Sequence, residues 1–331
     1  MEESRLCQVA RQGFYVTRLF GMAPYALPKG VGPARRPRQQ LLFAYSLVPF
    51  FLYMSALAYN RSLFQVLRDY RIDLGTSIAN LWPKLIVTGI TAIFSETSSM
   101  PLVLNNSILL VELAQSIMRY KAVTNVWISI SNFDQALDLN VTRRGLNVAE
   151  LRSPMLDDLK FYLRTILFIS FAGWGVVSWT GITFYHDQLL GNLSYMLPYY
   201  GTYVAVLQFC GLVLLLGQRF EFLNDSILAS TRRGIFMHKD LLNIKKIESE
   251  HRKLLETSKT LNSAFSWSLL LHLFSMFFHT VNNTYQFLHF SMKEGIDNLG
   301  KGLCAISWIF MFLIEIWAPH FVCEYTSGQV K

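Results

Sequence analysis

Charged residues are scarce in this chain, and this scarcity decides its class. Charged side chains make up 16% of the 331 residues, whereas apolar ones make up 52%. Soluble domains carry roughly 25% charged residues, so this composition leaves too few polar groups to cover an aqueous surface. Much of the surface must therefore face lipid. We expect an integral membrane protein.

The sequence also lacks the cysteine and histidine patterns typical of disulfide frameworks, metal sites and membrane enzymes. Cys7 and Cys323 fall on the side expected to be reducing, while Cys210 and Cys304 fall inside apolar segments, so no disulfide framework is expected. No spacing matches a metal site, and the histidines lack the clusters that a membrane desaturase or hydroxylase would use. We expect no enzyme, no cofactor and no metal. The first forty residues also lack the apolar segment and cleavage site of a signal peptide.

Apolar segments long enough to cross a membrane are present instead. A spanning helix needs roughly 20 residues to cross about 30 Å of hydrocarbon. Five segments approach that length: 41–59, 161–184, 197–217, 265–290 and 302–320. The region 81–118 is less clear, since 83–94 is too short and 100–118 carries Asn105, Asn106 and Glu112. We expect one crossing there, which gives an all-α, polytopic helical membrane protein with six spans.

Basic residues gather on one side of these spans. Of the 30 Lys and Arg residues, 24 lie in four places: seven in 1–40, seven in 119–164, nine in 218–264 and one at Lys331. The positive-inside rule then places the N-terminus in the cytoplasm. A second crossing within 81–118 would move the group at 119–164 outside, which is why one crossing is preferred. The basic residues lie beside spans rather than in runs with exposed aromatics, so no nucleic-acid partner is expected.

This topology divides the chain into three parts. Residues 1–40 form a cytoplasmic N-terminal segment, 41–320 the transmembrane domain, and 321–331 a cytoplasmic tail. Two cytoplasmic loops, 119–160 and 218–264, connect the spans. In the second loop, 237–264 has apolar residues at helical spacing opposite lysines, which predicts an amphipathic helix that runs straight into the span at Phe265. Its apolar stripe packs either on a neighbouring helix or on another subunit.

Several stretches resemble insect gustatory receptors, particularly the group that includes the fructose receptors. The similar stretches, in order along the chain, are FYVTRLFGMAPYAL (14–27), Pro198-Tyr199-Tyr200, GQRFEFLN (217–224), LNSAFSWSLLLHLFSMFFHTVNNTY (261–285) and APHFVCEYTSGQVK (318–331). Each stretch alone is a weak signal, but together they cover most of the chain in register.

The resemblance implies a gustatory chemoreceptor subunit of a tetrameric, ligand-gated cation channel in the plasma membrane. Its partners would be a small-molecule tastant, membrane lipid and other gustatory receptor subunits, in a homo- or hetero-tetramer. That family has a seventh span, which lines the pore and carries Thr-Tyr, five residues, then Gln-Phe. No seventh apolar run follows 302–320, and Thr284-Tyr285-Gln286-Phe287 lacks the spacer. This absence predicts a truncated, pore-less chain.

A ligand site is expected in the outer halves of the spans. On the fifth span, His279, Asn283 and Gln286 recur at helical spacing. Amide and imidazole groups with aromatic faces suit a sugar. The third and fourth spans add Trp174, Trp179, Thr183, Tyr199 and Tyr203. A sugar is the leading ligand, with bitter compounds or carbon dioxide as alternatives.

Each of these residues also has a structural interpretation. Asn and His form hydrogen bonds between membrane helices, and interfacial aromatic residues form an ordinary belt. Glu112 and Glu315 either mark functional sites within the membrane or pack among neighbouring helices. Among the sequons, Asn60 and Asn192 are the two expected to carry glycans. The alternative function is a multi-span transporter or other polytopic membrane protein, although the chain lacks the internal repeat typical of transporters.

Overall fold

Long helices form the whole of the described architecture. The computed structural model describes residues 13–23, 44–49, 51–53, 100–143, 148–185, 189–232, 238–292 and 295–330, and these contain helices and turns but no strand. The long helices are α5 Met100–Met118, α6 Tyr120–Arg143, α7 Val148–Tyr185, α8 Leu189–Arg232, α9 His238–Ser291 and α10 Ile296–Val330. The all-α prediction is confirmed.

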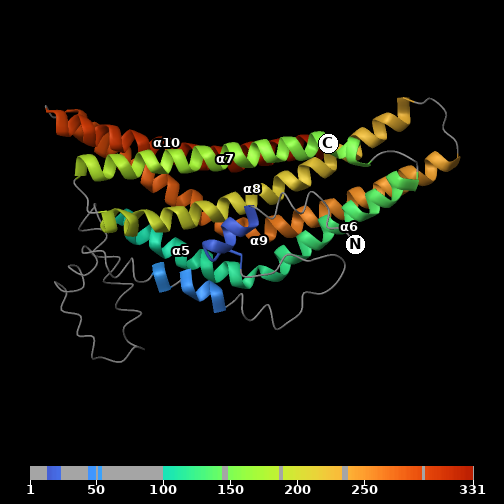
Figure 1. Cartoon of the computed structure of the whole chain (residues 1–331), viewed down its shortest axis with the longest axis horizontal. Coiled ribbons are helices and arrows are strands. Elements are labelled where there is room, and N and C mark those ends of the chain that lie inside the picture. The colour runs from blue at the N-terminus through green and yellow to red at the C-terminus, as the bar shows by residue number, and fades with distance from the viewer. Residues whose placement is uncertain are drawn as a thin grey trace.

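These helices run roughly along one axis of an elongated bundle (Figure 1). Helix α6 ends and α7 begins at one end of the bundle, where α8 also ends and α9 begins. At the opposite end α7 is followed by α8, and α9 by α10. We call the first the inner end and the second the outer end, following the orientation that the basic residues predict. That orientation itself stays a prediction.

Helix α8 is the central helix of the membrane part. It contacts α5, α7, α9 and α10, and 83% of its most apolar window is buried, against 28% for α7. A helix that is apolar on all sides is expected to be surrounded by other helices. The run from Val204 to Phe220, which is almost continuously apolar, therefore becomes the axis around which the other spans pack.

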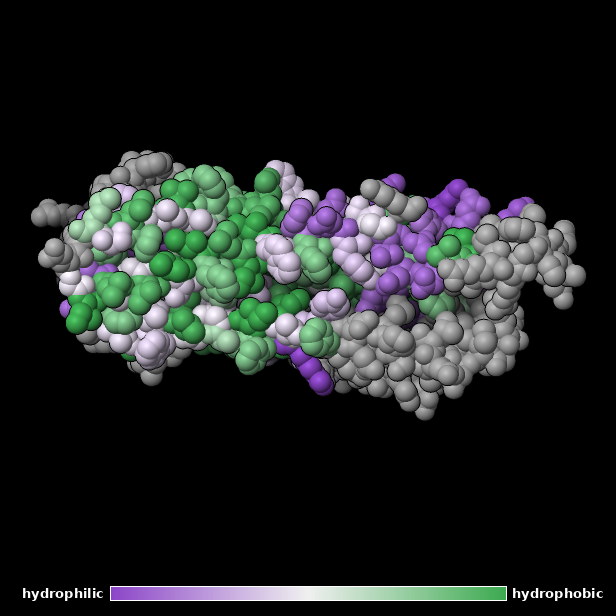
Figure 2. All heavy atoms as spheres, turned by 90° about the horizontal axis from the view of Figure 1, so that it is seen from above, coloured by the Kyte–Doolittle hydropathy of each residue, from purple (hydrophilic) through white to green (hydrophobic). Residues whose placement is uncertain are grey.

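The outer part of the bundle has an apolar exterior. Figure 2 shows hydrophobic residues over this part and hydrophilic residues toward the inner end. Four described helical segments are long and apolar enough to cross a membrane: 164–184, 196–225, 245–291 and 296–330. They overlap the last four apolar segments found in the sequence. Large exposed side chains such as Phe168, Phe277 and Phe310 give these helices a lipid-facing surface.

Helix α9 extends well beyond any bilayer. Its 54 residues correspond to about 81 Å at 1.5 Å per residue. The prediction that the amphipathic segment 237–264 continues directly into the span is confirmed, because α9 runs without interruption from His238 to Ser291. The two regions treated as loops in the sequence are thus largely helical: α6 and the start of α7 occupy the first, and α8 and α9 occupy the second.

Two further helix boundaries differ from the simplest interpretation of the sequence. Residues between α5 and α6 stay in helical register, since the Arg119 amide donates to Gln115 O at 2.8 Å and the Val123 amide donates to Arg119 O at 3.0 Å. Helix α10 continues past Pro319 to Val330. Residues 321–330, expected as a tail, are therefore part of a helix that packs against α8.

The N-terminal segment 13–23 packs inside the bundle rather than apart from it. Its short helix covers residues 13–19, and the turn that follows contains Gly21, whose positive φ of 78° suits glycine. A Cβ at this position would lie 3.1 Å from Leu113 of α5. Phe14 meets Trp127 of α6 edge-on, with ring centroids 6.5 Å apart. The segment that resembles the receptor family thus rests on the α5–α6 unit.

Candidate functional site

A stripe of polar side chains runs along the membrane part of α9. It consists of Ser268, His272, Ser275, His279 and Asn283, spaced three or four residues apart, and each is at most 7% exposed. Side chains at this spacing share one helix face, and here that face points into the bundle. Buried polar groups in lipid are costly unless they are paired or functional, so this stripe is the first place to look for a site.

The inner part of the stripe contacts two buried carboxyl groups. His272 Nε2 lies 3.4 Å from Glu315 Oε2 of α10, and both side chains are almost fully buried. Ser268 Oγ bonds to Glu112 Oε1 of α5, and Glu112 Oε2 accepts a hydrogen bond from Arg119 Nη2 at 3.3 Å. The two glutamates are thus packed among neighbouring helices rather than exposed to lipid.

The outer part of the stripe joins a cluster of aromatic rings, which we call the outer cluster. It consists of Trp174, Tyr199, Tyr203, His279, Asn283, Trp308 and Phe312. Tyr199 Oη lies 3.4 Å from His279 Nδ1, and the His279 ring stacks on Phe312 with centroids 5.2 Å apart. Tyr203 Oη and Ser170 Oγ are 2.5 Å apart. Imidazole, phenol and amide groups are therefore gathered beside aromatic faces.

Some polar atoms in this part of the bundle have no hydrogen-bond partner among the described residues. They include Trp174 Nε1, Ser275 Oγ and Glu315 Oε1. Buried polar atoms are usually hydrogen-bonded, and an unpaired one costs about 1–3 kcal/mol. The Tyr199–His279 contact is also long for a hydrogen bond from a hydroxyl. The outer cluster thus contains unused hydrogen-bonding capacity.

A second group, which we call the inner clamp, joins α6, α8 and α10 near the inner end. Its members on α8 are Gly217, Arg219, Glu221 and Asn224; their partners are Asp134, Tyr325, Thr326 and Gln329. Arg219 Nη2 donates to Asp134 Oδ2 at 2.9 Å and its Nη1 donates to Leu215 O at 2.7 Å. Both ion-pair side chains are buried, at 2% and 4% exposure.

The contacts between α8 and α10 complete the inner clamp. Tyr325 Oη donates to Glu221 Oε2 at 2.7 Å, and Asn224 Nδ2 donates to Gln329 O at 2.6 Å. A Cβ at Gly217 would lie 2.7 Å from Thr326 Oγ1, so a glycine is needed where the two helices meet. The stretch GQRFEFLN therefore holds three helices together at the inner end.

The sequence of these helices matches a known protein family. The family model described as 7tm chemosensory receptor matches residues 90–331, about three-quarters of the chain. The chain belongs to this family of chemosensory receptors, the insect gustatory receptor family. No individual curated protein matches the sequence significantly. The resemblance inferred from the separate stretches is confirmed at the level of the family, which is a family of receptors and not of enzymes.

The receptor brings most of the predicted site residues together. Trp174, Tyr199, Tyr203, His279 and Asn283 are all buried in or beside the outer cluster. Gln286 lies one turn further along α9 and is partly buried. By contrast, Trp179 is 63% exposed and Thr183 is also exposed, so both lie on the lipid-facing side of α7 and do not join the cluster.

The two predicted glycan positions have different outcomes. Asn60 lies outside the described residues. Asn192 lies in the first turn of α8 with its side chain 2% exposed, so a glycan there requires that side chain to become accessible. As for metals, the described residues contain no group of three His, Cys, Asp or Glu side chains able to hold an ion.

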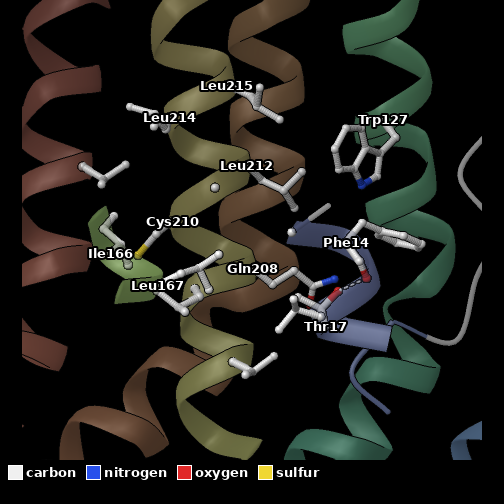
Figure 3. A pocket seen from close by; sticks show the side chains of 16 residues that line it. Phe14, Thr17, Trp127, Ile166, Leu167, Gln208, Cys210, Leu212, Leu214 and Leu215 are labelled. Carbon is white, nitrogen blue, oxygen red and sulfur yellow. Dashed lines mark hydrogen bonds between the residues drawn. The ribbon is translucent and has the colours of Figure 1, made fainter. Parts of the chain in front are cut away.

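Sequence reasoning missed two features of the receptor. Trp308 and Phe312 of α10 complete the outer cluster, and their spacing of four residues on one helix face was an available signal. The second feature is an apolar cavity between the N-terminal segment, α6, α7 and α8 (Figure 3). No sequence pattern predicts it, because its walls come from segments as far apart in the sequence as Gly13 and Val322.

Proposed function

We propose that this receptor is a gustatory receptor subunit that favours opening of a cation channel, formed in the plasma membrane with other gustatory receptor subunits, when a small polar tastant, most favourably a sugar, binds at the outer cluster. The observation that carries this proposal is the burial of His279, Asn283 and Tyr199 beside aromatic rings in the outer, membrane-embedded part of the bundle. Membership of the chemosensory receptor family supports the same role.

The chemistry of the outer cluster favours a ligand with several hydroxyl groups. A sugar hydroxyl can accept from Trp174 Nε1, which has no acceptor within the described part of the chain. Another can replace the long contact between Tyr199 and His279. Aromatic faces such as that of Phe312 pack on the C–H surfaces of a sugar ring. An apolar ligand would leave all these groups unsatisfied.

Activation then requires that the ligand prefer one arrangement of the helices. A ligand shifts an equilibrium only by the difference between its affinities for the two states. In the described arrangement, the Tyr199, His279 and Phe312 rings contact one another directly. Binding between them would separate α8, α9 and α10 at the outer end. In a homo- or hetero-tetramer with other gustatory receptor subunits, that separation would favour the open channel.

The proposal is tested with two variants on α9 and one control. Asn283→Ala and Gln286→Ala each remove an amide from the proposed site. Thr284→Ala changes the exposed face between them and leaves the site intact. We expect a sugar that thermally stabilises the purified wild-type receptor to lose most of that effect in the two amide variants and to keep it in the control.

Ligand-evoked currents provide the second measurement. In cells that express the receptor with its companion subunits, the amide variants should shift the sugar dose–response by about fivefold to a hundredfold, the effect of losing a buried hydrogen bond of 1–3 kcal/mol. Surface delivery should be normal in all three variants. Unchanged dose–response curves and unchanged thermal shifts in both amide variants would assign Asn283 and Gln286 to packing alone.

A further inference from the structure

An apolar cavity opens beside the central helix, separate from the outer cluster. It is lined by four residues of the N-terminal segment, eight residues of α8 between Val204 and Leu215, Trp127 of α6, Ile166 and Leu167 of α7, and Val322 of α10. In Figure 3, Cys210 and Leu214 of α8 face Ile166 and Leu167 on one side, while Phe14, Thr17 and Trp127 close the other. Nearly all of the lining is hydrocarbon.

The size of the cavity limits what it can hold. Its volume is about 90 Å³, which is smaller than the roughly 150 Å³ cavity that binds a benzene ring. Along α8, however, its walls extend from Val204 to Leu215, which is about 16 Å at 1.5 Å per residue. An apolar space of this volume excludes a sugar or a fused ring system, and it holds only part of a single alkyl chain.

One polar group in the wall lacks a partner. Trp127 is 7% exposed, and its indole N–H has no hydrogen-bond acceptor among the described residues. Buried indole N–H groups usually find an acceptor. The hydroxyl of Thr17, in contrast, already donates to Phe14 O at 2.8 Å. The occupant should therefore offer an acceptor oxygen beside its alkyl chain, at the end of the cavity where Trp127 lies.

The cavity also lies where lipid can reach it. Its α8 wall belongs to the membrane-spanning segment 196–225. On α7 the lining residues Ile166 and Leu167 are half-buried, and the next residues along the helix include Phe168 and Phe171, which are 74% and 59% exposed. An alkyl chain can thus enter sideways from the bilayer without crossing water.

We propose that this cavity binds the part of a membrane phospholipid's acyl chain that lies next to its ester group, and that the ester carbonyl accepts the hydrogen bond from Trp127 Nε1. The chain lies along α8 between α7 and the N-terminal segment. Because Phe14 and Thr17 form part of the wall, the bound lipid joins the N-terminal segment to the bundle. A free fatty acid has the same chemistry, so the test includes both sources.

A glycine in the wall provides the blocking variant. Gly211 lines the cavity, and a Cβ there would meet no atom within 4 Å. Gly211→Leu therefore adds a side chain to the cavity wall at a position with room for its Cβ, and replacing a glycine within a helix also raises helix propensity. Gly175 of α7 is the matched control, because its Cβ would also meet no atom within 4 Å and it does not line the cavity.

The experiment uses the full chain in nanodiscs of phosphatidylcholine that include phosphatidylcholine with a diazirine in the middle of one acyl chain. After irradiation, we expect labelled peptides from α8 within 204–215 and from the start of the α7 span. Gly211→Leu should lower this labelling at least fivefold, and Gly175→Leu should leave it unchanged. Equal labelling of the wild type and Gly211→Leu would overturn the proposal.

Two further arms test the head of the lipid. The ester-linked probe should label the wild type about fivefold more than an ether-linked one, the effect of roughly one net hydrogen bond, and Trp127→Phe should remove this difference. Equal labelling by both probes in the wild type would reject the role of Trp127. Diazirine-labelled palmitic acid at the same concentration should label the cavity less than the phospholipid does; stronger labelling would reject the phospholipid as the occupant.

Discussion

The buried face of α9 changes character along its length. Toward the inner end it consists of Leu254, Leu261 and Phe265, all at most 1% exposed. Toward the outer end it becomes His272, Ser275 and His279, which are equally buried. The same helix therefore has an apolar interior where it leaves the membrane and a polar interior where it crosses it.

The change in the buried face of α9 follows from what surrounds the helix, which is water at the inner end and lipid within the membrane. At the inner end the exterior of α9 is charged, as Arg252 and Lys253 illustrate, so burial of leucine removes apolar surface from water and stabilises the fold. Within lipid that driving force is absent, and helices associate through packing and interhelical polar contacts. The two parts of the receptor are thus held together by different interactions.

Hydrogen bonding differs between the two parts as well. The inner clamp forms short, direct contacts such as Tyr325 to Glu221 and Asn224 to Gln329. The outer region keeps unpaired atoms on Trp174 and Ser275, judged over the residues that the structure describes. Trp127 of α6 also keeps an unpaired atom among these residues, so it is the short contacts of the inner clamp that set the two parts apart, and we expect these contacts to contribute more to stability. Four predictions about stability test this difference between the two parts. The sugar-binding test of Asn283→Ala and Gln286→Ala is a fifth prediction.

The largest effect is expected at the buried ion pair of the inner clamp. Asp134→Ala leaves the Arg219 guanidinium without its carboxylate in a buried site, which should destabilise the receptor by about 3–5 kcal/mol. The melting midpoint, measured by size-exclusion chromatography after heating in detergent, should fall by roughly 6 °C or more.

A paired replacement separates loss of charge from loss of packing. The double variant Asp134→Leu with Arg219→Met removes both charges and keeps apolar volume, so it should recover most of the lost stability. If Asp134→Ala melts like the wild type, the ion pair contributes nothing and the assignment of this region to stability is wrong.

A smaller loss is expected where α8 and α10 meet. Gly217→Leu places a side chain against Thr326 and Tyr325, whose nearest atoms would lie 2.7 and 2.9 Å from the new Cβ. Overpacking of this kind costs about 1–3 kcal/mol. Gly175→Leu, which meets no atom at its Cβ, is the control in the same melting assay. Equal midpoints for the two variants would show that α8 and α10 do not meet closely at Gly217.

A single hydrogen bond of the inner clamp should contribute less. Tyr325→Phe removes the donor to Glu221 and keeps the ring that packs beside Gly217. We expect a loss of about 1 kcal/mol, the net contribution of one hydrogen bond. Tyr285→Phe, at a position 67% exposed on α9, should leave the melting midpoint unchanged.

The smallest change in stability is expected in the outer part, where a substitution should stabilise the receptor slightly, or leave its stability unchanged, instead of destabilising it. Ser275→Ala removes a buried hydroxyl that has no hydrogen-bond partner within the described ranges, so stability should stay equal or rise by up to about 1 kcal/mol. A clear loss of stability would show that Ser275 is satisfied in the folded receptor, and the contrast between the two parts would weaken.

Local patterns in the sequence predicted much of this architecture. The continuity of α9 followed from apolar spacing in 237–264 that ran directly into an apolar segment. The grouping of His279 with Asn283 followed from a spacing of four. Helical periodicity also explains why Trp179 and Thr183 were wrongly predicted to join the site. They lie five and nine positions after Trp174, which places them about 140° and 180° around α7 from that buried residue.

Contacts between distant segments could not be predicted in this way. Asp134 and Arg219 are 85 residues apart, and each alone is an ordinary charged residue in a predicted loop. The continuation of α10 beyond Pro319 depends on its packing against Gly217 and Asn224 of α8, because local sequence favours an end near that proline. The apolar cavity beside α8 likewise exists only after five separate segments have packed together.

The uninterrupted length of α9 gives the receptor a mechanical property. From Phe265 to His238 the helix extends about 40 Å, so a tilt of about 5° around Phe265 displaces its inner tip by about 3.5 Å. On the other side of this pivot, His279 lies about 21 Å away, so it moves by about half that distance. If α9 tilts as a rigid body about this point, a small rearrangement at His279 would become a displacement about twice as large at His238.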